Sequence, residues 1–314
     1  MEKQVIQPAE MEKTEKRPFK SGFVAIIGRP NVGKSTLMNL IMGQKLAIMS
    51  DKPQTTRNKI RCIYTSEEGQ IIFIDTPGIH KPLHRLGEYM VQLSLKTMAE
   101  VDVILYVIEA CSPLGGGDRY ILKQLQQVKT PVVLAVNKMD LVKREDSVDA
   151  LIESFRQEKE FAAVVKLSAL AGGYPHELIR ILLDLLPEGP MYYPADVITE
   201  QPERFIVAEL IREKVLHLTR EEIPHAVAVE VEEMVKRKND LVYIRAVIYT
   251  ERDSQKGIIV GKNGSMLKNI GTLARQEIEN LLGSKVYLDL WVKVKKDWRN
   301  KESFLRPMFA RELE

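Results

Sequence analysis

Cysteine is scarce in this sequence of 314 residues, which contains only Cys62 and Cys111. Two isolated cysteines exclude a disulfide framework and a cysteine-based metal site. Both lie in apolar stretches, so we expect two small core or near-core hydrophobes in a reduced, cytoplasmic protein. Long apolar runs are also missing, and no stretch approaches the ~18 residues that a membrane-spanning helix needs. The sequence therefore predicts no transmembrane segment.

The first twenty residues lack the apolar core of a signal peptide and mix both signs of charge. We expect a mobile tail over residues 1–20. A strong net charge is absent as well, because the formal charge of the chain is +3. Basic residues do gather near the C-terminus, where residues 253–306 hold eleven Lys or Arg and six Asp or Glu. Such a segment hints at an anionic partner, but taken alone it is more often a solvated face.

The length predicts two domains, and the hydrophobic pattern of the first differs from that of the second. In the first, short apolar runs that suit strands buried on both faces alternate with amphipathic helical segments. The predicted strands cover 23–27, 59–65 (an edge strand), 71–74, 103–108, 132–136 and 164–167. The predicted helices cover 34–42, 86–98, 118–127, 147–156 and 175–186. This alternation predicts a doubly wound α/β domain with a mostly parallel sheet over residues 21–187.

Four prolines between residues 187 and 202 predict a linker over residues 188–204. The order of elements then changes to helix, strand, strand, short helix, long helix and strand. We place these at 205–216, 226–235, 241–250, 256–260, 265–282 and 285–294. Residues 205–314 therefore form a smaller α+β domain with a C-terminal tail.

A phosphate-binding loop lies between the first predicted strand and the first predicted helix. Its residues fit G-x-x-x-x-G-K-[ST]: Gly28, Arg29, Pro30, Asn31, Val32, Gly33, Lys34 and Ser35, followed by Thr36. The glycines let successive backbone N–H groups face a phosphate, and the helix N-terminus adds its positive dipole. Lys34 supplies a full charge to the β- and γ-phosphate oxygens, and Ser35 places its hydroxyl on Mg²⁺.

A second motif closes the strand at 71–74 and consists of Asp75, Thr76, Pro77 and Gly78. Asp75 then lies at the carboxyl edge of the sheet, where it can bind the water shell of Mg²⁺, while the Gly78 N–H can reach the γ-phosphate. The polar segment between residues 50 and 59 contains Thr55 and Thr56. A loop threonine there can close over the metal and let go after hydrolysis. We favour Thr56 over Thr55, so the expected metal ligands are Ser35, Thr56 and Asp75.

Two further motifs follow later strands: Asn137, Lys138, Met139 and Asp140, and then Ser168, Ala169 and Leu170. The Asp140 carboxylate can accept two hydrogen bonds from guanine that adenine cannot offer. Asn137 can hold the base N7, the Lys138 stem can cover the ring, and the Ala169 N–H can reach O6. These residues predict GTP and GDP as the ligands.

The five motifs P-N-V-G-K-S, Q-T-T-R, D-T-P-G, N-K-M-D and S-A-L together resemble those of the Era family of GTPases. The resemblance covers nearly the whole chain outside the N-terminal tail. It implies a GTPase that assists assembly of the small (30S) ribosomal subunit and associates peripherally with the inner face of the cell membrane. Nothing in the composition supports the membrane association. We expect a monomer.

Ras-like GTPases orient the attacking water with a glutamine directly after the glycine that corresponds to Gly78. In this chain the residue at that position is Ile79. We therefore expect slow, electrostatic hydrolysis, and we expect His80 and His84 to be solvated. The resemblance implies that Asn31 helps to bind K⁺ as an activating monovalent cation. The predicted catalytic residues are accordingly Lys34, Thr56 and Asn31.

The second domain contains a G-x-x-G loop between a short and a long helix. With the order of elements, it resembles a type II K-homology (KH) domain, in which the loop clamps about four nucleotides of RNA backbone. The predicted RNA-binding residues are Lys256, Gly261, Lys262, Asn263, Gly264, Lys268 and Arg275. By the family resemblance, the RNA is the 3′ end of the small-subunit ribosomal RNA. We expect Trp291 to pack inward from the last strand, with Trp298 covering its end.

Two alternatives differ in function. One is a tRNA-modification GTPase, which shares the P-loop but inserts its GTPase domain in a helical domain. The other is an RNA-binding scaffold that uses GTP for stability without significant hydrolysis.

Overall fold

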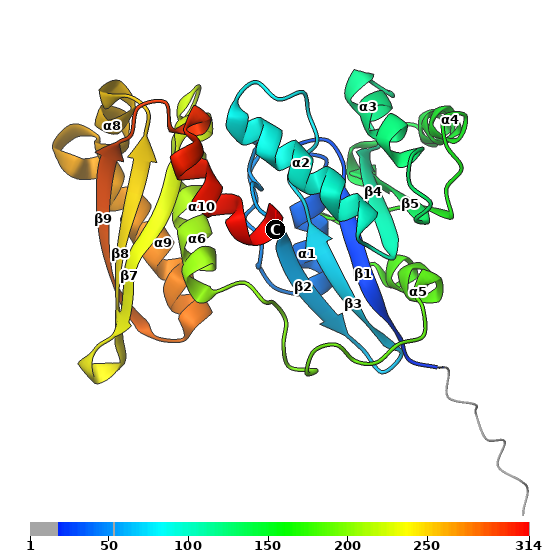
Figure 1. The fold of residues 1–314 in the computed structure, drawn as a ribbon, viewed down its shortest axis with the longest axis horizontal. Coiled ribbons are helices and arrows are strands. Elements are labelled where there is room, and N and C mark those ends of the chain that lie inside the picture. The colour runs from blue at the N-terminus through cyan, green and yellow to red at the C-terminus, as the bar shows by residue number, and fades with distance from the viewer. Residues whose placement is uncertain (1–17, 53, 314) are drawn as a thin grey trace, which may run out of the picture.

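The computed structural model describes residues 18–52 and 54–313, and only the backbone of residues 310–313. Most of the predicted N-terminal tail, residues 1–17, lies outside the described residues. The chain forms two domains that lie side by side, with a helix near the C-terminus between them (Figure 1). An α/β domain with a mostly parallel sheet precedes a smaller α+β domain, as the sequence predicts.

The first domain has a six-stranded sheet in the order β2-β3-β1-β4-β5-β6. All neighbouring strands are parallel except β2 and β3. The strands are β1 (Lys20–Ile27), β2 (Ile60–Thr65), β3 (Gly69–Asp75), β4 (Val103–Glu109), β5 (Val132–Asn137) and β6 (Ala163–Lys166). Because the carboxyl ends of parallel strands meet at one edge, the loops after β1, β3, β5 and β6 converge there.

Helices cover both faces of this sheet, which explains why its strands are almost continuously apolar. One core lies beneath α1 (Lys34–Met42) and α5 (His176–Leu185). The other lies beneath α2 (Arg85–Ala99), α3 (Gly116–Leu125) and α4 (Glu145–Arg156).

The second domain has a three-stranded sheet in the order β7-β8-β9, with β7 antiparallel and β9 parallel to β8. Helices α6 and α9 pack on one face of this sheet around a separate core. Its elements are α6 (Glu203–Leu218), α7 (Ile223–Ala226), β7 (Ala228–Lys236), β8 (Leu241–Thr250), α8 (Asp253–Val260), α9 (Ser265–Leu282) and β9 (Lys285–Val294).

The segment between the domains is tied to the first domain. Its Ile198 carbonyl accepts a hydrogen bond from the Ile63 N–H at 2.9 Å, so it runs along edge strand β2. The Gln70 side chain binds the backbone N–H groups of Tyr192 and Tyr193. Helix α6 already begins at Glu203.

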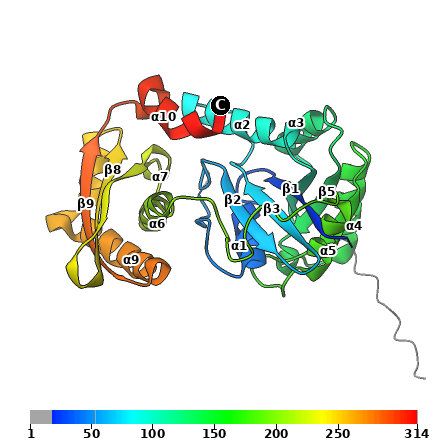
Figure 2. The same cartoon turned by 60° about the horizontal axis from the view of Figure 1, so that its bottom comes forward.

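The predicted C-terminal tail contains helix α10 (Glu302–Leu313), which lies along α2 of the first domain (Figure 2). The rings of Phe309 and Tyr89 stack with centroids 5.3 Å apart. Trp298 is fully buried and donates its indole N–H to the Ala226 carbonyl at 2.9 Å. Side chains from the two domains thus share a small apolar core.

Two expectations about apolar residues are wrong. Trp291 is 56% exposed, because it lies on the face of β9 opposite to the helices. Cys111 is exposed in the turn after β4, whereas Cys62 is buried in β2.

Candidate functional site

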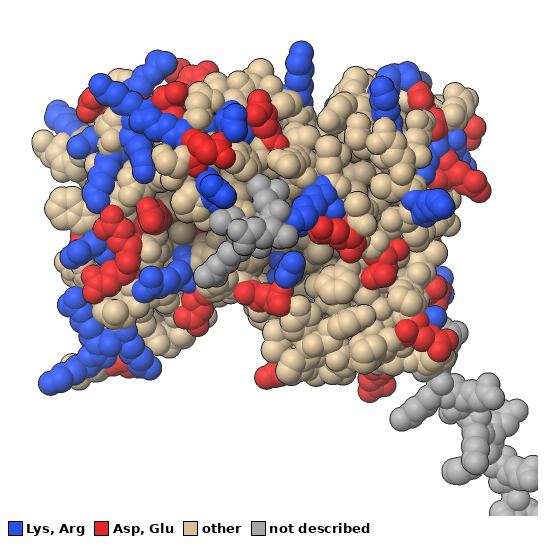
Figure 3. Space-filling view, viewed as in Figure 1, with Lys and Arg blue, Asp and Glu red and all other residues tan. Residues whose placement is uncertain are grey.

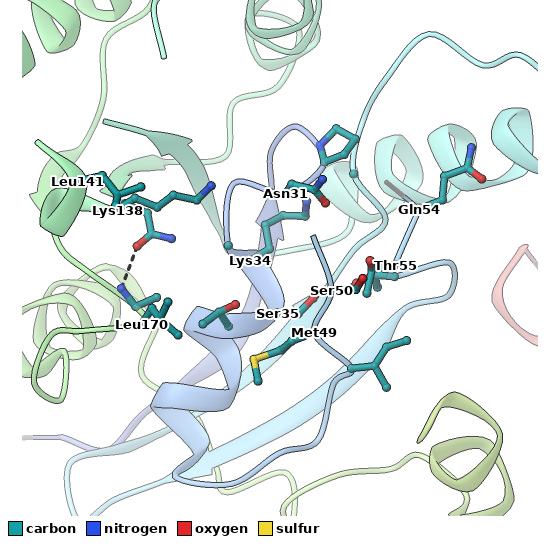
Figure 4. A pocket seen from close by; sticks show the side chains of 18 of the residues that line it. Asn31, Lys34, Ser35, Met49, Ser50, Gln54, Thr55, Lys138, Leu141 and Leu170 are labelled. Carbon is teal, nitrogen blue, oxygen red and sulfur yellow. Dashed lines mark hydrogen bonds between the residues drawn. The ribbon is translucent and has the colours of Figure 1, made fainter. Parts of the chain in front are cut away.

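A cavity of about 310 Å³ opens at the carboxyl edge of the first sheet (Figure 4). All four motif loops of the first domain reach it, together with the polar segment that precedes β2. The predicted residues that line it are Pro30, Asn31, Gly33, Lys34, Ser35, Thr36, Thr56, Gly78, Asn137, Lys138, Asp140, Ala169 and Leu170. Segments more than 130 residues apart in the sequence therefore share one pocket.

The remaining predicted residues are not among those that line the cavity. Thr76 donates its hydroxyl to the Ile26 carbonyl at 2.8 Å, and Arg29 pairs with Asp118 at 3.0 Å. These two side chains support the loops. The predicted residues outside the lining are Gly28, Arg29, Val32, Asp75, Thr76, Pro77, Met139 and Ser168.

The loop after β1 needs glycine where it approaches its neighbours. Gly33 has a φ of 98°, and a Cβ there would lie 2.2 Å from the Asn137 amide nitrogen. A Cβ on Gly78 would lie 2.7 Å from the Pro30 Cα. Backbone N–H groups of these loops can therefore come close to a phosphate, which a larger side chain would prevent.

Lys34 is buried at the base of the loop, where its Nζ donates to the carbonyl oxygens of Arg29 at 2.9 Å and Gly28 at 3.3 Å. Burial lowers the pKa of Lys34 to about 8, and the nearby Asp75 opposes that change. The ammonium is therefore mostly charged at neutral pH. A polyanion beside it would stabilise that charge further.

Ser35, Thr56 and Asp75 meet in the way that a hard cation requires. The Ser35 hydroxyl donates to Asp75 Oδ2 at 2.6 Å and lies 2.9 Å from the Thr56 hydroxyl. Asp75 Oδ1 is buried without a hydrogen-bond partner, and burial raises the pKa of this carboxyl to about 6. The set of oxygen donors and the unpartnered carboxylate oxygen fit Mg²⁺ with its water shell.

The hydroxyl groups of the two candidate threonines, Thr55 and Thr56, point in different directions. The Thr55 hydroxyl donates to the Lys52 carbonyl at 2.6 Å, away from Ser35. The Thr56 hydroxyl lies 3.4 Å from Asp75 Oδ2. The geometry therefore favours Thr56 as the metal contact.

Asn137 ties three motif loops together. Its amide N–H donates to the Val32 carbonyl at 2.8 Å, and its Oδ1 accepts from the Ala169 N–H at 2.9 Å. Asp140 accepts a hydrogen bond from the Ser168 hydroxyl, which orients the carboxylate at the pocket. The second N–H of Asn137 is the one that can face a base, because its first already holds the loop.

The two residues directly after Gly78 are both engaged in contacts within the protein. Ile79 is 1% exposed and packs in the core, with its N–H bound to the Gly28 carbonyl at 3.1 Å. His80 contacts the Gly78 carbonyl at 2.9 Å and the Gln54 amide at 3.4 Å, so our expectation of a solvated His80 is wrong. Asn31 has a φ of 65° and donates its amide to the Asp51 carbonyl at 2.6 Å.

A second groove of about 530 Å³ lies on the second domain, between α9 and β9. Gly264, Lys268 and Arg275 line it, whereas Lys256, Gly261, Lys262 and Asn263 lie outside the lining. Gly261 has a φ of 72°, and a Cβ there would lie 2.7 Å from the Met266 Cβ. Lys and Arg side chains are numerous on the visible face of this domain, at the left of Figure 3.

Comparisons with known proteins identify the families of the two domains. The family model described as "50S ribosome-binding GTPase" matches residues 23–138, and the KH domain model matches residues 222–299. The chain is 59% identical to GTPase Era of Carboxydothermus hydrogenoformans over 297 residues, covering 94% of this chain and 99% of the relative. It is 56% identical to GTPase Era of Alkaliphilus oremlandii, with 92% and 98% covered. The chain belongs to the Era family of GTPases.

Two solved Era structures have the same two-domain fold. An Aquifex aeolicus Era variant bound to GDP and AlF₄⁻ is 41% identical, with a TM-score of 0.88 and coverage of 92% of this chain and 98% of its own. An Era complex with MgGDPNP and nucleotides 1506–1542 of 16S ribosomal RNA gives the same identity and coverage, with a TM-score of 0.89.

Several pocket residues of this chain were not predicted from the sequence. Gln54 is the first residue of Q-T-T-R, but the others belong to none of the motifs, so no local signal marks them. Those in the nucleotide pocket are Ile48, Met49, Ser50, Gln54 and Leu141, and those in the second groove are Leu267, Gly271, Thr272, Tyr287, Leu288 and Leu290.

Two further observations bear on the site. Over the described part of the chain, no three His, Cys, Asp or Glu side chains gather in a way that could hold a metal ion. The hydroxyl and carboxylate oxygens of the nucleotide pocket are a different kind of donor set. Within the same residues, none of the helices has the length and apolar character needed to cross a bilayer.

Proposed function

We propose that this Era-family GTPase binds GTP with Mg²⁺ in the first-domain pocket, hydrolyses it slowly, and binds RNA through its KH domain. The proposed RNA is the 3′ end of the small-subunit ribosomal RNA, and the proposed role is to assist assembly of the small ribosomal subunit. The convergence of five motifs on one pocket carries the nucleotide half of this proposal. The related Era complex with 16S ribosomal RNA supports the RNA half.

In the pocket, the backbone N–H groups of residues 31–35 bind phosphate oxygens, and Lys34 places its ammonium against the β- and γ-phosphates. Ser35, Thr56 and Asp75 would hold Mg²⁺, and the bound ion would supply positive charge against the phosphates. Asp140, with Asn137 and Ala169 beside it, selects guanine. Because Ile79 cannot orient the attacking water, we expect hydrolysis to depend on charge stabilisation by Lys34, the P-loop and the bound cations.

Asn31 adds a proposed monovalent cation site. Its side chain lines the pocket and bonds the Asp51 carbonyl, so the P-loop and the following polar segment supply oxygen atoms there. K⁺ at this position would provide positive charge beside the phosphates. Hydrolysis should then be faster in K⁺ than in Na⁺, and Asn31→Ala should remove that difference with little change in nucleotide affinity. Equal wild-type rates in the two salts would contradict the K⁺ site.

The second groove suits a single RNA strand. Gly264 lies where a backbone phosphate must approach, and Lys268 and Arg275 supply positive charge along α9. Tyr287 is 60% exposed and offers a ring for stacking.

We place the GTPase domain at 21–187, the linker at 188–204 and the KH domain at 205–314, and we propose a monomer in the cytoplasm. Peripheral membrane association stays a prediction of the family resemblance.

A single-turnover measurement tests the enzymatic half of the proposal. Mix excess protein with GTP and Mg²⁺, and follow GDP and phosphate. We expect complete, slow conversion that requires Mg²⁺ and is lost in Lys34→Ala. GTP binding without conversion would instead favour the scaffold alternative. The tRNA-modification alternative is not supported, because the second domain matches a KH model rather than a helical domain.

A further inference from the structure

The loop that carries Thr56 is held by the second domain. We call residues 45–52 and 54–57 the switch segment; it runs from the end of α1 toward β2. On one side it reaches the proposed metal site through Thr56. On the other side it contacts α6, a helix more than 140 residues later in the chain. Switch geometry therefore depends on a helix outside the GTPase domain.

Arg212 makes the most direct of these contacts. Its Nη2 donates to the Thr55 carbonyl, and its Nη1 lies 3.4 Å from the Gln54 carbonyl. The residue is 2% exposed, and Glu209 on the same helix fixes the guanidinium through Nε at 2.7 Å and Nη2 at 2.5 Å. A rigid fork held at one end by a carboxylate orients the carbonyls at its other end.

Those carbonyls immediately precede Thr56 in the chain. The Thr56 hydroxyl lies 2.9 Å from Ser35 and 3.4 Å from Asp75, so a small rotation of the Thr55–Thr56 peptide would remove it from the metal site. Gln54 has a φ of 62°, a conformation that a glutamine rarely adopts without support. Arg212 binds the backbone at that strained position.

Glu213, the next residue on α6, holds the other end of the switch segment. Its Oε1 accepts from the Met49 N–H at 2.9 Å, and its Oε2 accepts from Lys45 at 2.6 Å. Lys45 also binds Glu277, which lies on α9 two residues after the groove residue Arg275. One charged cluster therefore joins the switch segment to the helix that borders the proposed RNA groove.

We propose that Arg212 is a positioning residue for GTP hydrolysis: it holds the Gln54 and Thr55 carbonyls so that Thr56 faces the metal site. The GTPase site is then incomplete without α6 of the KH domain. Arg212 touches neither nucleotide nor metal in this arrangement. This inference rests on the proposed Mg²⁺–GTP site.

The alternative is that Arg212 only stabilises the interface between the two domains. Arg85 offers a matched comparison, because its Nε binds Glu302 at 2.9 Å across the same pair of domains but far from the switch segment. Arg204, exposed near the start of α6, controls for the substitution itself. If Arg212 only stabilises the interface, Arg212→Met and Arg85→Met should have the same effects on GTP hydrolysis and on its Mg²⁺ dependence.

The test uses the full chain with Arg212→Met, Arg212→Lys, Arg85→Met and Arg204→Met. For each, measure single-turnover GTP hydrolysis against Mg²⁺ concentration, GDP affinity without Mg²⁺, and the thermal unfolding midpoint. For Arg212→Met we expect a lower maximal rate and a higher half-saturating Mg²⁺ concentration. The ratio of the first quantity to the second should fall about 10- to 100-fold, as for other residues that orient metal ligands. Arg212→Lys, which keeps the charge but not the fork, should lie between Arg212→Met and wild type.

GDP affinity without Mg²⁺ should stay at the wild-type value in all four variants. Arg85→Met and Arg204→Met should keep both the wild-type rate and the wild-type Mg²⁺ dependence. Equal effects of Arg212→Met and Arg85→Met, or an unchanged Mg²⁺ dependence in Arg212→Met, would overturn the positioning role while leaving the GTPase proposal intact. A wild-type protein without Mg²⁺-dependent hydrolysis would instead contradict the proposed function.

Discussion

Asp140 accepts a hydrogen bond from Ser168 at the pocket, and an asparagine at this position could keep that bond through its Oδ1. The amide cannot accept both protons that guanine donates, however. Asp140→Asn should therefore lose affinity for GTP and gain affinity for xanthosine triphosphate, with a change in preference of about 10⁴. Competition binding of the two nucleotides measures this ratio. Unchanged GTP affinity in a folded Asp140→Asn protein would rule out the guanine contact.

Asp75 makes the pocket sensitive to pH. Burial raises its pKa from 3.8 to about 6, against the opposing charge of Lys34. Without metal, the folded protein holds this proton more tightly than the unfolded chain, so the resulting stabilisation is present at low pH and is lost as the pH rises from about 4 to about 6. Mg²⁺ needs the ionised carboxylate, so its affinity should fall as the pH falls below about 6.

Thermal unfolding of the GDP-loaded protein tests the predicted fall in Mg²⁺ affinity at low pH. The increase in midpoint caused by Mg²⁺ should be larger at about pH 7.5 than at about pH 5.5, where the Asp75 carboxyl of the metal-free protein is largely protonated. Asp75→Asn should show a small increase at both values. The same increase at both pH values in the wild type would mean that Asp75 does not titrate with the metal.

Helix α9 has a glycine at each end, and the pair separates RNA contact from backbone strain. Gly264 has a φ of 77° and Gly283 a φ of 62°, and at neither does an added Cβ meet an atom within 4 Å. Gly264→Asp and Gly283→Asp should therefore strain the backbone to a similar degree. Only Gly264 lines the groove, so Gly264→Asp alone should abolish RNA binding, because it sets a carboxylate against a phosphate.

Filter binding of a labelled RNA with the 3′ sequence of the small-subunit ribosomal RNA measures this difference. GTP binding should persist in both variants, since the nucleotide pocket lies in the other domain. RNA affinity should also fall with added salt in the wild type. Equal RNA affinities of the two variants would show that the groove is not the RNA site.

The two domains of the molecule are linked by the switch segment, α6 and α9, and this link predicts coupling between nucleotide and RNA. A switch segment that closes on GTP changes its contacts with Arg212 and Glu213, so RNA affinity should depend on the bound nucleotide. We expect tighter RNA binding in the GTP state, by about 5- to 150-fold, which is the range of typical coupling free energies.

RNA titrations of protein loaded with GDP or with a non-hydrolysable GTP analogue measure this ratio. By reciprocity, saturating RNA should raise affinity for the analogue over GDP by the same factor. Identical RNA affinities in the two states would mean that the contacts across the interface are fixed. The Gly264→Asp protein serves as the baseline, because it should show no RNA-dependent change in nucleotide affinity.

Local sequence patterns predicted most elements to within a few residues. Helix α1 and α9 and strands β8 and β9 have the expected bounds, because each begins or ends at a glycine, a charged turn or a break in apolar periodicity. Helix α10 was missed. Its hydrophobic residues pack between α2 of the first domain and Tyr249 and Trp298 of its own domain, and Pro307 within it is a strong local signal against a helix.

The order of residues along the chain was enough to predict the pocket chemistry, since each motif follows a strand and parallel strands bring their carboxyl ends together. The contacts of Trp291, His80 and Arg212 were not predictable in this way. Arg212 binds a carbonyl 157 residues away, and α6 carries no motif that marks the partner. The contact of Arg212 depends on how the two domains pack against each other. The sequence around Arg212 does not indicate that packing.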